Sequence, residues 1–299
     1  MTRSKLKAVA PKAAEPSKPK ILIYGKPGVQ KTWVSLDFPS AYYIDTEGGA
    51  NLPAYTDKLD KSGGVYFGID QGSLSFSDII DQVRALATEQ HSYKTLVIDS
   101  ISRIFNYEVT KEGERLGDKN AFGADKKPAL AMMRRLIDWL LRLDMNVILI
   151  AHQKAEWGLD AKRERTEVGT TFDCWDKLEY ELHLVLNIIK QGESHKAFVR
   201  KSRLPGFPSS SVFEWSFDEF AARYGRAAIE GDHKPIQLAS QEQLTEMNGL
   251  IELMRVPEEH ISKWLTKANV DSLAEMDSEK IALIITYLKS KITNPGQGE

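Results

Sequence analysis

The sequence of 299 residues predicts an α/β fold, in which a mostly parallel sheet is covered by helices on both faces, followed by a small all-α domain. Three observations support this prediction. Short apolar segments alternate with segments of helical periodicity up to about residue 228, which is typical of a parallel sheet. A glycine-containing loop directly follows the first apolar segment. Residues 240–293 show only the apolar spacing of amphipathic helices.

The elements follow in order along the chain. Five short apolar segments are predicted to form the parallel strands, namely 20–24, 41–45, 64–69, 94–99 and 145–151. Helical spacing predicts helices over 32–38, about 76–89 and roughly 127–143. Residues 182–191 and 195–202 flank the short sequence "GES", so we expect a hairpin that extends the sheet with an antiparallel pair.

The ends of the chain differ from this region in composition. Residues 1–19 contain five Lys or Arg and one Glu without apolar periodicity, so they are predicted to be a disordered basic tail. Residues 229–239 are interpreted as a linker. Three helices follow over 240–293, the first opened by a capping box of Ser240 and Gln243 and the second by Pro257. This module is acidic, with ten Asp or Glu and six Lys or Arg over 238–299.

Composition limits the classes of protein that fit. A net charge of −2 suggests no partner by itself, so any nucleic-acid surface must be a local patch. The single cysteine, Cys174, excludes an intrachain disulfide. No apolar run reaches the roughly 20 residues of a membrane helix, and the basic N-terminal residues, which lack an apolar region, are not expected to be a secretory signal. We therefore expect a cytoplasmic protein, of a bacterium or of an infected host cell. The histidines show no spacing that predicts zinc.

The sequence "GKPGVQKT" at 25–32 is close to the phosphate-binding pattern G-x-x-x-x-G-K-[ST]. Lys31 is expected to reach the β- and γ-phosphates, and the Thr32 hydroxyl to ligate Mg²⁺. Gln30 replaces the second glycine and keeps its backbone N–H, although its side chain strains or crowds the loop. The alternative is an ordinary turn. The residues expected to bind the nucleotide are Gly25, Lys26, Pro27, Gly28, Val29, Gln30, Lys31, Thr32 and Trp33.

Carboxylates follow two of the predicted strands. Asp99 ends the apolar segment "TLVID", where it is placed to hold Mg²⁺ directly or through water. Asp45 and Glu47 end the segment "YYIDTE", at the edge where α/β folds bind ligands. Hydrolysis needs a group that orients and deprotonates water, and Glu47 suits this role. The alternative is a solvated carboxylate in a glycine-rich turn.

In this order, "GKPGVQKT", "YYIDTEGG", "TLVIDS" and "VILIAHQK" resemble the ATPase core of the RecA-like superfamily. They are most similar to phage RecA-like ATPases implicated in single-strand annealing and recombination. The resemblance covers about residues 20–220 and implies a RecA-like ATPase domain over 20–228. It implies that Glu47 is the catalytic glutamate and that Gln153 senses the γ-phosphate and signals to a DNA-binding loop. His152, beside it, could contact phosphate or DNA.

The same resemblance implies an oligomer, a ring or a filament, with Mg²⁺ and ATP between subunits. Lys201 and Arg203 in "VRKSR" match residues that reach the neighbouring subunit's ATP. A basic strand end facing solvent is the alternative for these two residues. Small helical modules that end similar proteins suggest protein contact, for example with a single-strand-binding protein. A stabilising domain is the alternative for the module.

DNA contact is expected from two segments, 106–127 and 154–178, which are interpreted as loops. Both mix basic with acidic residues, and Trp157 and Phe172 lie in the second. Basic residues that follow phosphates and aromatic rings that stack on bases are typical of single-strand binding. A solvated loop of mixed charge is the alternative. The candidate DNA-binding residues are Lys126, Lys127, Lys162, Arg163 and Arg165.

The leading hypothesis is a Mg²⁺-dependent, DNA-stimulated ATPase that handles single-stranded DNA in phage recombination or annealing. A second hypothesis is a DNA-binding or annealing protein whose degenerate nucleotide site is regulatory and turns over little ATP. A small-molecule kinase is a third, which the "KSR" segment and the lack of a lid segment argue against. ATP hydrolysis measured with and without single-stranded DNA separates the first two.

Overall fold

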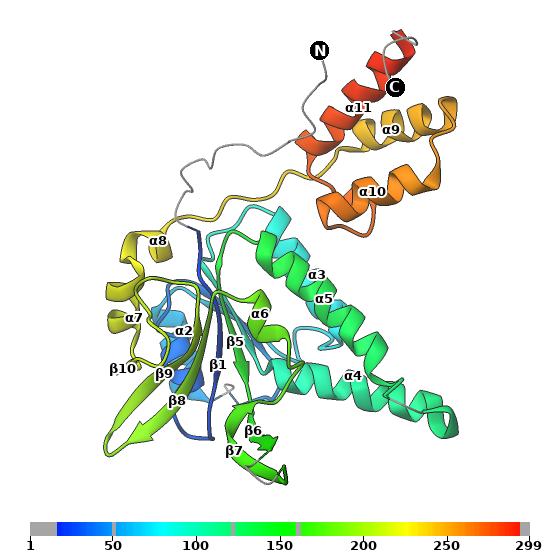
Figure 1. Cartoon of the computed structure of the whole chain (residues 1–299). Helices are drawn as coiled ribbons and strands as arrows, with labels where there is room; N and C mark the ends of the chain where they lie inside the picture. The colour runs from blue at the N-terminus through cyan, green and yellow to red at the C-terminus, as the bar shows by residue number, and fades with distance from the viewer. Residues whose placement is uncertain (1–16, 50–51, 121–122, 160–162, 294–299) are drawn as a thin grey trace, which may run out of the picture.

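A computed structural model describes residues 17–49, 52–120, 123–159 and 163–293, so nearly all of the predicted basic tail lies outside the described residues. Eight strands form one sheet in the order β10-β9-β8-β1-β5-β4-β2-β3 (Figure 1). The strands are β1 Lys20–Tyr24, β2 Ala41–Asp45, β3 Val65–Phe67, β4 Thr95–Asp99, β5 Asn146–Ala151, β8 Leu184–Gln191, β9 Ser194–Ser202 and β10 Val212–Glu214. Every pairing from β8 to β3 is parallel.

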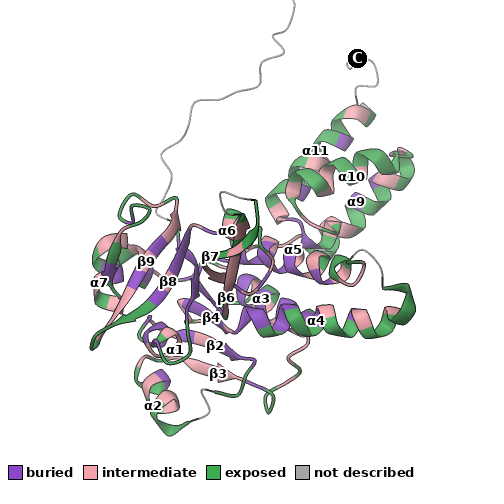
Figure 2. Ribbon diagram, turned by 60° about the horizontal axis from the view of Figure 1, so that its bottom comes forward, coloured by how far each residue is buried: buried purple, intermediate pink, exposed green. Residues whose placement is uncertain are grey.

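Helices cover both faces of this sheet because successive residues of the central strands are apolar and point to opposite faces. One face packs against α3, α4 and α5, and the other against α1, α2, α7 and α8. Figure 2 shows the buried strands between these layers. The helices are α1 Lys31–Ser35, α2 Pro53–Lys61, α3 Phe76–Thr88, α4 Ile101–Leu116, α5 Lys126–Arg142, α6 Leu178–Glu181, α7 Phe217–Tyr224 and α8 Arg226–Glu230. The predicted fold class is confirmed.

The predicted hairpin is present and extends the sheet beside β1. β8 pairs parallel with β1, with Ile21 opposite Leu184, and only β9 and β10 are antiparallel additions. The helical segment α6 and the turn before β8 bring the chain back to the start of β1, so β8 can run in the same direction as β1. The expectation of an antiparallel pair that extends the sheet is therefore confirmed for β8 and β9, and the parallel direction of β8 against β1 is an additional finding.

Both segments interpreted as loops are largely regular structure. Residues 101–116 form α4, where the Ser100 side chain accepts from the Arg103 N–H and Ile101, Ile104 and Phe105 are buried on one face. This N-cap and apolar spacing explain the helix. Residues 153–172 form a separate antiparallel hairpin of β6 Gln153–Leu159 and β7 Arg165–Phe172. The predictions of a loop over 106–127 and over 154–178 are wrong in this respect.

Three helices follow the sheet, namely α9 Gln241–Leu253, α10 Glu258–Ala268 and α11 Ser278–Thr293. Ser240 and Gln243 form the predicted capping box, and Pro257 is the residue directly before α10. The helices share a core of their own and meet α5 through polar contacts, such as the ion pair between Arg135 and Glu275. The division of the chain at 229–239 stays a prediction. Within the described part of the chain, no helix is long and apolar enough to cross a membrane.

Candidate nucleotide-binding site

The phosphate-loop segment connects β1 to α1 and depends on two backbone features. A Cβ at Gly25 would collide with the Ile188 carbonyl oxygen, so only glycine fits there. Gln30 has φ 63° and ψ 28°, in the left-handed region that favours glycine. Its carbonyl oxygen accepts from the Trp215 indole N–H at 3.3 Å and from the Val34 N–H at 3.2 Å. The loop therefore has the conformation of a position that usually holds glycine, while its residue is glutamine.

Lys31 folds back over this loop. Its ammonium nitrogen donates to the carbonyl oxygens of Gly25 and Lys26, each at 2.9 Å. Burial lowers the pKa of the Lys31 ammonium, and the carboxylates of Asp99 and Glu47 oppose that shift. The Lys31 side chain thus lies at the mouth of the loop with two acidic groups in its surroundings.

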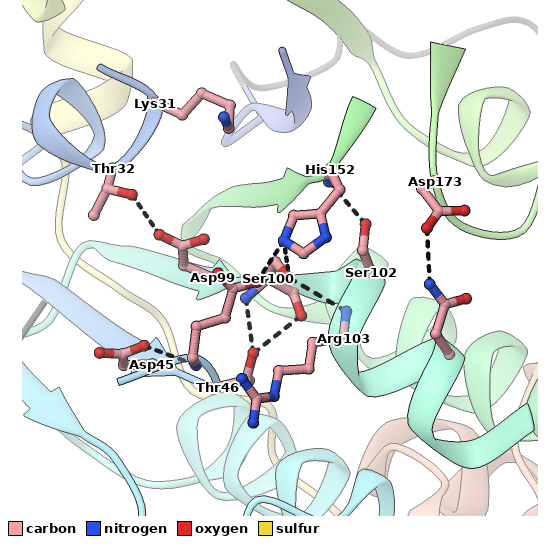
Figure 3. Close-up of polar contacts among 12 residues, drawn as sticks. Lys31, Thr32, Asp45, Thr46, Asp99, Ser100, Ser102, Arg103, His152 and Asp173 are labelled. Carbon is pink, nitrogen blue, oxygen red and sulfur yellow. Dashed lines mark hydrogen bonds and ion pairs between the residues drawn. The ribbon is translucent and has the colours of Figure 1, made fainter. Parts of the chain in front are cut away.

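Thr32 and Asp99 face each other across the site, as Figure 3 shows. The Thr32 hydroxyl donates to Asp99 Oδ2 at 2.5 Å, and the Tyr43 hydroxyl donates to the same oxygen at 3.0 Å. Burial raises the pKa of Asp99, and these two hydrogen bonds oppose the rise. A hydroxyl and a carboxylate oxygen side by side match the hard oxygen ligands that Mg²⁺ takes together with phosphate oxygens. The side chains of Thr32 and Asp99 therefore have the chemistry that a Mg²⁺ site requires.

Asp45 shapes the turn that carries Glu47. One Asp45 oxygen accepts from the N–H groups of Glu47 at 3.0 Å and Gly48 at 2.8 Å, and the other accepts from the Tyr66 hydroxyl at 3.1 Å. Only 2% of Asp45 is exposed, whereas 34% of the Glu47 side chain is exposed. The two carboxylates of "YYIDTE" therefore differ in their contacts. Asp45 accepts hydrogen bonds from the backbone of the turn, whereas the Glu47 side chain faces the site.

Glu47 contacts two side chains that end neighbouring strands. Ser100, directly after β4, donates its hydroxyl to Glu47 Oε1 at 2.5 Å. His152, directly after β5, places Nε2 at 2.5 Å from the same oxygen, and its ring lies 3.3 Å from the Ser100 hydroxyl. Ser100 was not a predicted site residue, although its position as the N-cap after "TLVID" was a usable signal. The pairing of His152 with Glu47 was also missed.

The hairpin formed by β6 and β7 begins directly beside this site. Gln153 is its first residue and pairs with Phe172, and the Asp173 N–H donates to the His152 carbonyl oxygen at 2.8 Å. Trp157 on β6 is 53% exposed, with the Arg165 guanidinium 5.0 Å from its ring centre. A hollow of about 540 Å³ lies along the hairpin and reaches Arg200 of β9.

The other predicted site residues lie apart from the phosphate loop. Arg163 is exposed at the hairpin turn, and Lys162 lies outside the described residues. Lys126 and Lys127 begin α5, beyond the far end of α4, so they are not on the hairpin. Lys201 and Arg203 donate to the carbonyl oxygens of Leu182 and Tyr180, respectively. The structure thus brings together the loop, Asp99 and Glu47, with Gln153 next to them.

The phosphate loop and the carboxylates beside it define a class of protein, the P-loop ATPases, and comparison with known protein families agrees with this class. Residues 17–204 match the AAA_24 family, described as an AAA domain. The match spans more than half of the chain, so the chain belongs to this family of AAA-domain ATPases. Among solved structures, it is similar to a prototypical ATPase from the type III secretion system of pathogenic bacteria, at 12% identity and a TM-score of 0.38, over 91% of this chain and 81% of that chain. A search of curated proteins found no match.

Proposed function

We propose that this ATPase binds and hydrolyses ATP with Mg²⁺ and acts on single-stranded DNA in phage recombination or annealing, as an oligomer with ATP at subunit interfaces. The observation that supports the proposal most is the convergence of Lys31, Thr32, Asp99 and Glu47 at one edge of the sheet, beside an exposed hairpin. Proximity of a cation, a metal-ligand pair and a candidate base is what phosphoryl transfer to water requires.

Each side chain has a proposed role at a stated atom. The Lys31 ammonium exchanges its two loop carbonyl oxygens for phosphate oxygens. Thr32 and Asp99, whose side chains are hydrogen-bonded to each other, would hold Mg²⁺, which would neutralise charge on the phosphates. Glu47 Oε2 orients a water molecule and accepts its proton, because Oε1 is occupied by Ser100 and His152. Gln153, next to His152, is the proposed sensor of the γ-phosphate.

The hairpin of β6 and β7 supports single-stranded DNA as the partner. Trp157 presents a large exposed ring, and Arg165 stacks on it at 5.0 Å. Aromatic rings that stack on bases, combined with cations near the backbone phosphates, are the usual means of binding single strands. Arg163 at the turn adds a second exposed cation. We propose that Trp157 and these two arginines form the contact with DNA, with Lys162, Lys126 and Lys127 as further candidates.

A specific observation favours a second candidate function. Gln30 has a left-handed backbone conformation that disfavours a residue with a Cβ, so the phosphate loop departs from the pattern where the pattern is strictest. This departure is compatible with a DNA-binding or annealing protein that uses ATP for regulation and turns over little of it. The two candidates share the site and the DNA partner and differ in the rate of hydrolysis.

The groove between α10 and α11 supports a protein partner. Its volume is about 420 Å³, and Leu283 and Tyr287 on one face of α11 are 71% and 54% exposed. Lys267 and Lys280 line the same groove, within a module that is acidic overall. An apolar groove bordered by lysines is complementary to a segment with acidic and apolar residues. We propose that a single-strand-binding protein of the infected cell contacts the ATPase here.

Steady-state ATP hydrolysis with and without single-stranded DNA tests the proposed activity. We expect DNA-stimulated turnover in the unaltered protein. Lys31→Ala removes the phosphate-binding cation and abolishes turnover, and Glu47→Gln lowers kcat by at least about 100-fold while ATP binding persists, because only the base is lost. Lys61→Ala, an exposed lysine at the end of α2, is the matched control and keeps full activity.

Two results separate the candidates. If the unaltered protein binds single-stranded DNA and ATP but does not hydrolyse ATP, the nucleotide site is regulatory and the first candidate function is wrong. Turnover that does not respond to DNA, together with no measurable DNA binding, contradicts single-stranded DNA as the partner in both candidate functions. The proposal that the protein hydrolyses ATP then still stands.

A further inference from the structure

The Glu47 carboxylate is held by one of its two oxygens. Ser100 Oγ and His152 Nε2 both lie 2.5 Å from Oε1. A carboxylate accepts hydrogen bonds and donates none when ionised, so His152 contributes a proton on Nε2. Within the described part of the chain, Oε2 has no hydrogen-bond partner. The two bonds therefore fix the rotation of the carboxylate and leave Oε2 as the oxygen available to water.

Each of the two donor residues is held in place by a hydrogen bond of its own backbone N–H, at the end of β4 or of β5. The Ser100 N–H donates to Thr46 Oγ1 at 2.8 Å, which ties the start of α4 to the turn that carries Glu47. The His152 N–H donates to Ser102 Oγ at 2.8 Å, and Figure 3 shows this bond beside the His152 ring. A rigid support of this kind is what keeps a reacting group within the narrow geometry that proton transfer needs.

His152 also belongs to the base of the hairpin. Its carbonyl oxygen accepts from the Asp173 N–H at 2.8 Å, so both ends of the β6–β7 hairpin meet at this residue. The ring is half exposed, so packing does not enclose it on all sides. His152 is thus bonded through its side chain to Glu47 and through its backbone to the hairpin.

We propose that His152, together with Ser100, positions Glu47 for hydrolysis and transmits the state of the β6–β7 hairpin to it. This inference rests on the proposed function, in which Glu47 is the base. A hairpin that binds a ligand keeps the His152 backbone in the position where Nε2 reaches Oε1. A hairpin that shifts withdraws Nε2 and lets the carboxylate rotate. His152 is a positioning residue, since it acts through Glu47 and makes no contact with the reacting atoms.

The test compares two replacements of His152 in the full-length protein. His152→Phe keeps a ring and removes the donor, and His152→Gln keeps an N–H donor on a flexible side chain. We expect His152→Phe to lower kcat for ATP by about 10- to 100-fold with KM changed less than about threefold, because the base is misdirected while ATP is still bound. His152→Gln should recover kcat to within about fivefold of the unaltered protein.

Ser100→Ala provides a second, independent measurement. Because both donors act on Oε1, the double variant His152→Phe/Ser100→Ala should lose less than the product of the two single losses. Stimulation by single-stranded DNA should fall in His152→Phe, since the connection to the hairpin is broken. Fluorescent ATP binding with unchanged affinity shows that each variant is folded.

The outcomes distinguish this inference from the proposed function. If the unaltered protein hydrolyses ATP, Glu47→Gln is inactive and His152→Phe keeps full kcat, the role of His152 is wrong and the role of Glu47 stands. An increase in KM with unchanged kcat means that His152 contacts phosphate, and it also overturns the inference. If Glu47→Gln itself keeps full turnover, the proposed base is wrong.

Discussion

Gln30 lies in the phosphate loop at the position where the pattern requires glycine. The structure explains why the pattern has glycine there, because φ is 63° and the carbonyl is held by Trp215 and by the first turn of α1. The Gln30 side chain is exposed, so the residue contributes through its backbone. A left-handed conformation costs a residue with a Cβ about 1–2 kcal/mol relative to the right-handed helix.

Replacing Gln30 with glycine should therefore stabilise the protein. We expect Gln30→Gly to raise the free energy of unfolding by about 1 kcal/mol, since relief of the strain exceeds the entropy that glycine loses. ATP affinity should rise or stay unchanged. Urea unfolding and ATP titration measure the two effects. Gln30→Ala keeps the Cβ and serves as the control with no gain, and a loss of stability in Gln30→Gly would show a stabilising contact of the glutamine side chain.

At this scale the sequence indicates candidate site residues but not the contacts between them. Lys31, Thr32 and Asp99 were identified from a motif and from the end of an apolar strand, and the structure brings Thr32 against Asp99. The contacts of Glu47 with Ser100 and His152 depend on β2, β4 and β5 being neighbours in the sheet. Strand order is a tertiary property, so local patterns do not contain it.

The element that sequence reasoning described least well is the β6–β7 hairpin. The segment contains alternating Thr, Val and aromatic residues on β7, but charged residues and glycines interrupt the alternation on which strand prediction depends. The four central strands β1, β2, β4 and β5 were located because they are continuous apolar runs buried on both faces. An exposed hairpin has no such burial, and its pairing was invisible in the sequence.

The hairpin gives a prediction about DNA affinity. Trp157→Ala removes the exposed ring on which a base would stack, so we expect the Kd for single-stranded DNA to rise by about 10- to 100-fold, equivalent to roughly 1–3 kcal/mol. Fluorescence anisotropy with a labelled oligonucleotide of mixed sequence measures this change. Tyr287→Ala, an aromatic residue with similar exposure on α11, is the control and should bind DNA normally. Equal affinity of Trp157→Ala and the unaltered protein would remove the hairpin from the DNA surface.

The direction of the strands sets where each functional group lies in the whole molecule. The phosphate loop follows Tyr24, which pairs with Asn187 in the middle of β8. β9 runs back along β8, so that Lys201 pairs with Val185 near its start. Val185 is opposite Leu22 in the middle of β1, and the Arg203 N–H donates to His183, level with the start of β1, so the chain leads away from the phosphate loop between Lys201 and Arg203. The side chains of these two residues donate to the Leu182 and Tyr180 carbonyl oxygens, before the start of β8. This direction agrees with the proposal that Lys201 and Arg203 contact the ATP of a neighbouring subunit.

This arrangement predicts complementation between two inactive variants. If ATP lies between subunits, Lys31→Ala and Arg203→Ala each inactivate every site when alone. In a one-to-one mixture, a site formed by Lys31 of one variant and Arg203 of the other is intact, and random assembly makes about a quarter of the sites intact through a head-to-tail interface. We expect the mixture to regain up to about that fraction of ATP hydrolysis, measured after the two proteins are mixed with ATP and single-stranded DNA. Mixing Lys31→Ala with Glu47→Gln, two changes on the same side of the interface, is the control and restores nothing. Activity of Arg203→Ala alone, or failure of the two inactive variants to complement each other in a mixed oligomer, would contradict a role of Arg203 across the interface.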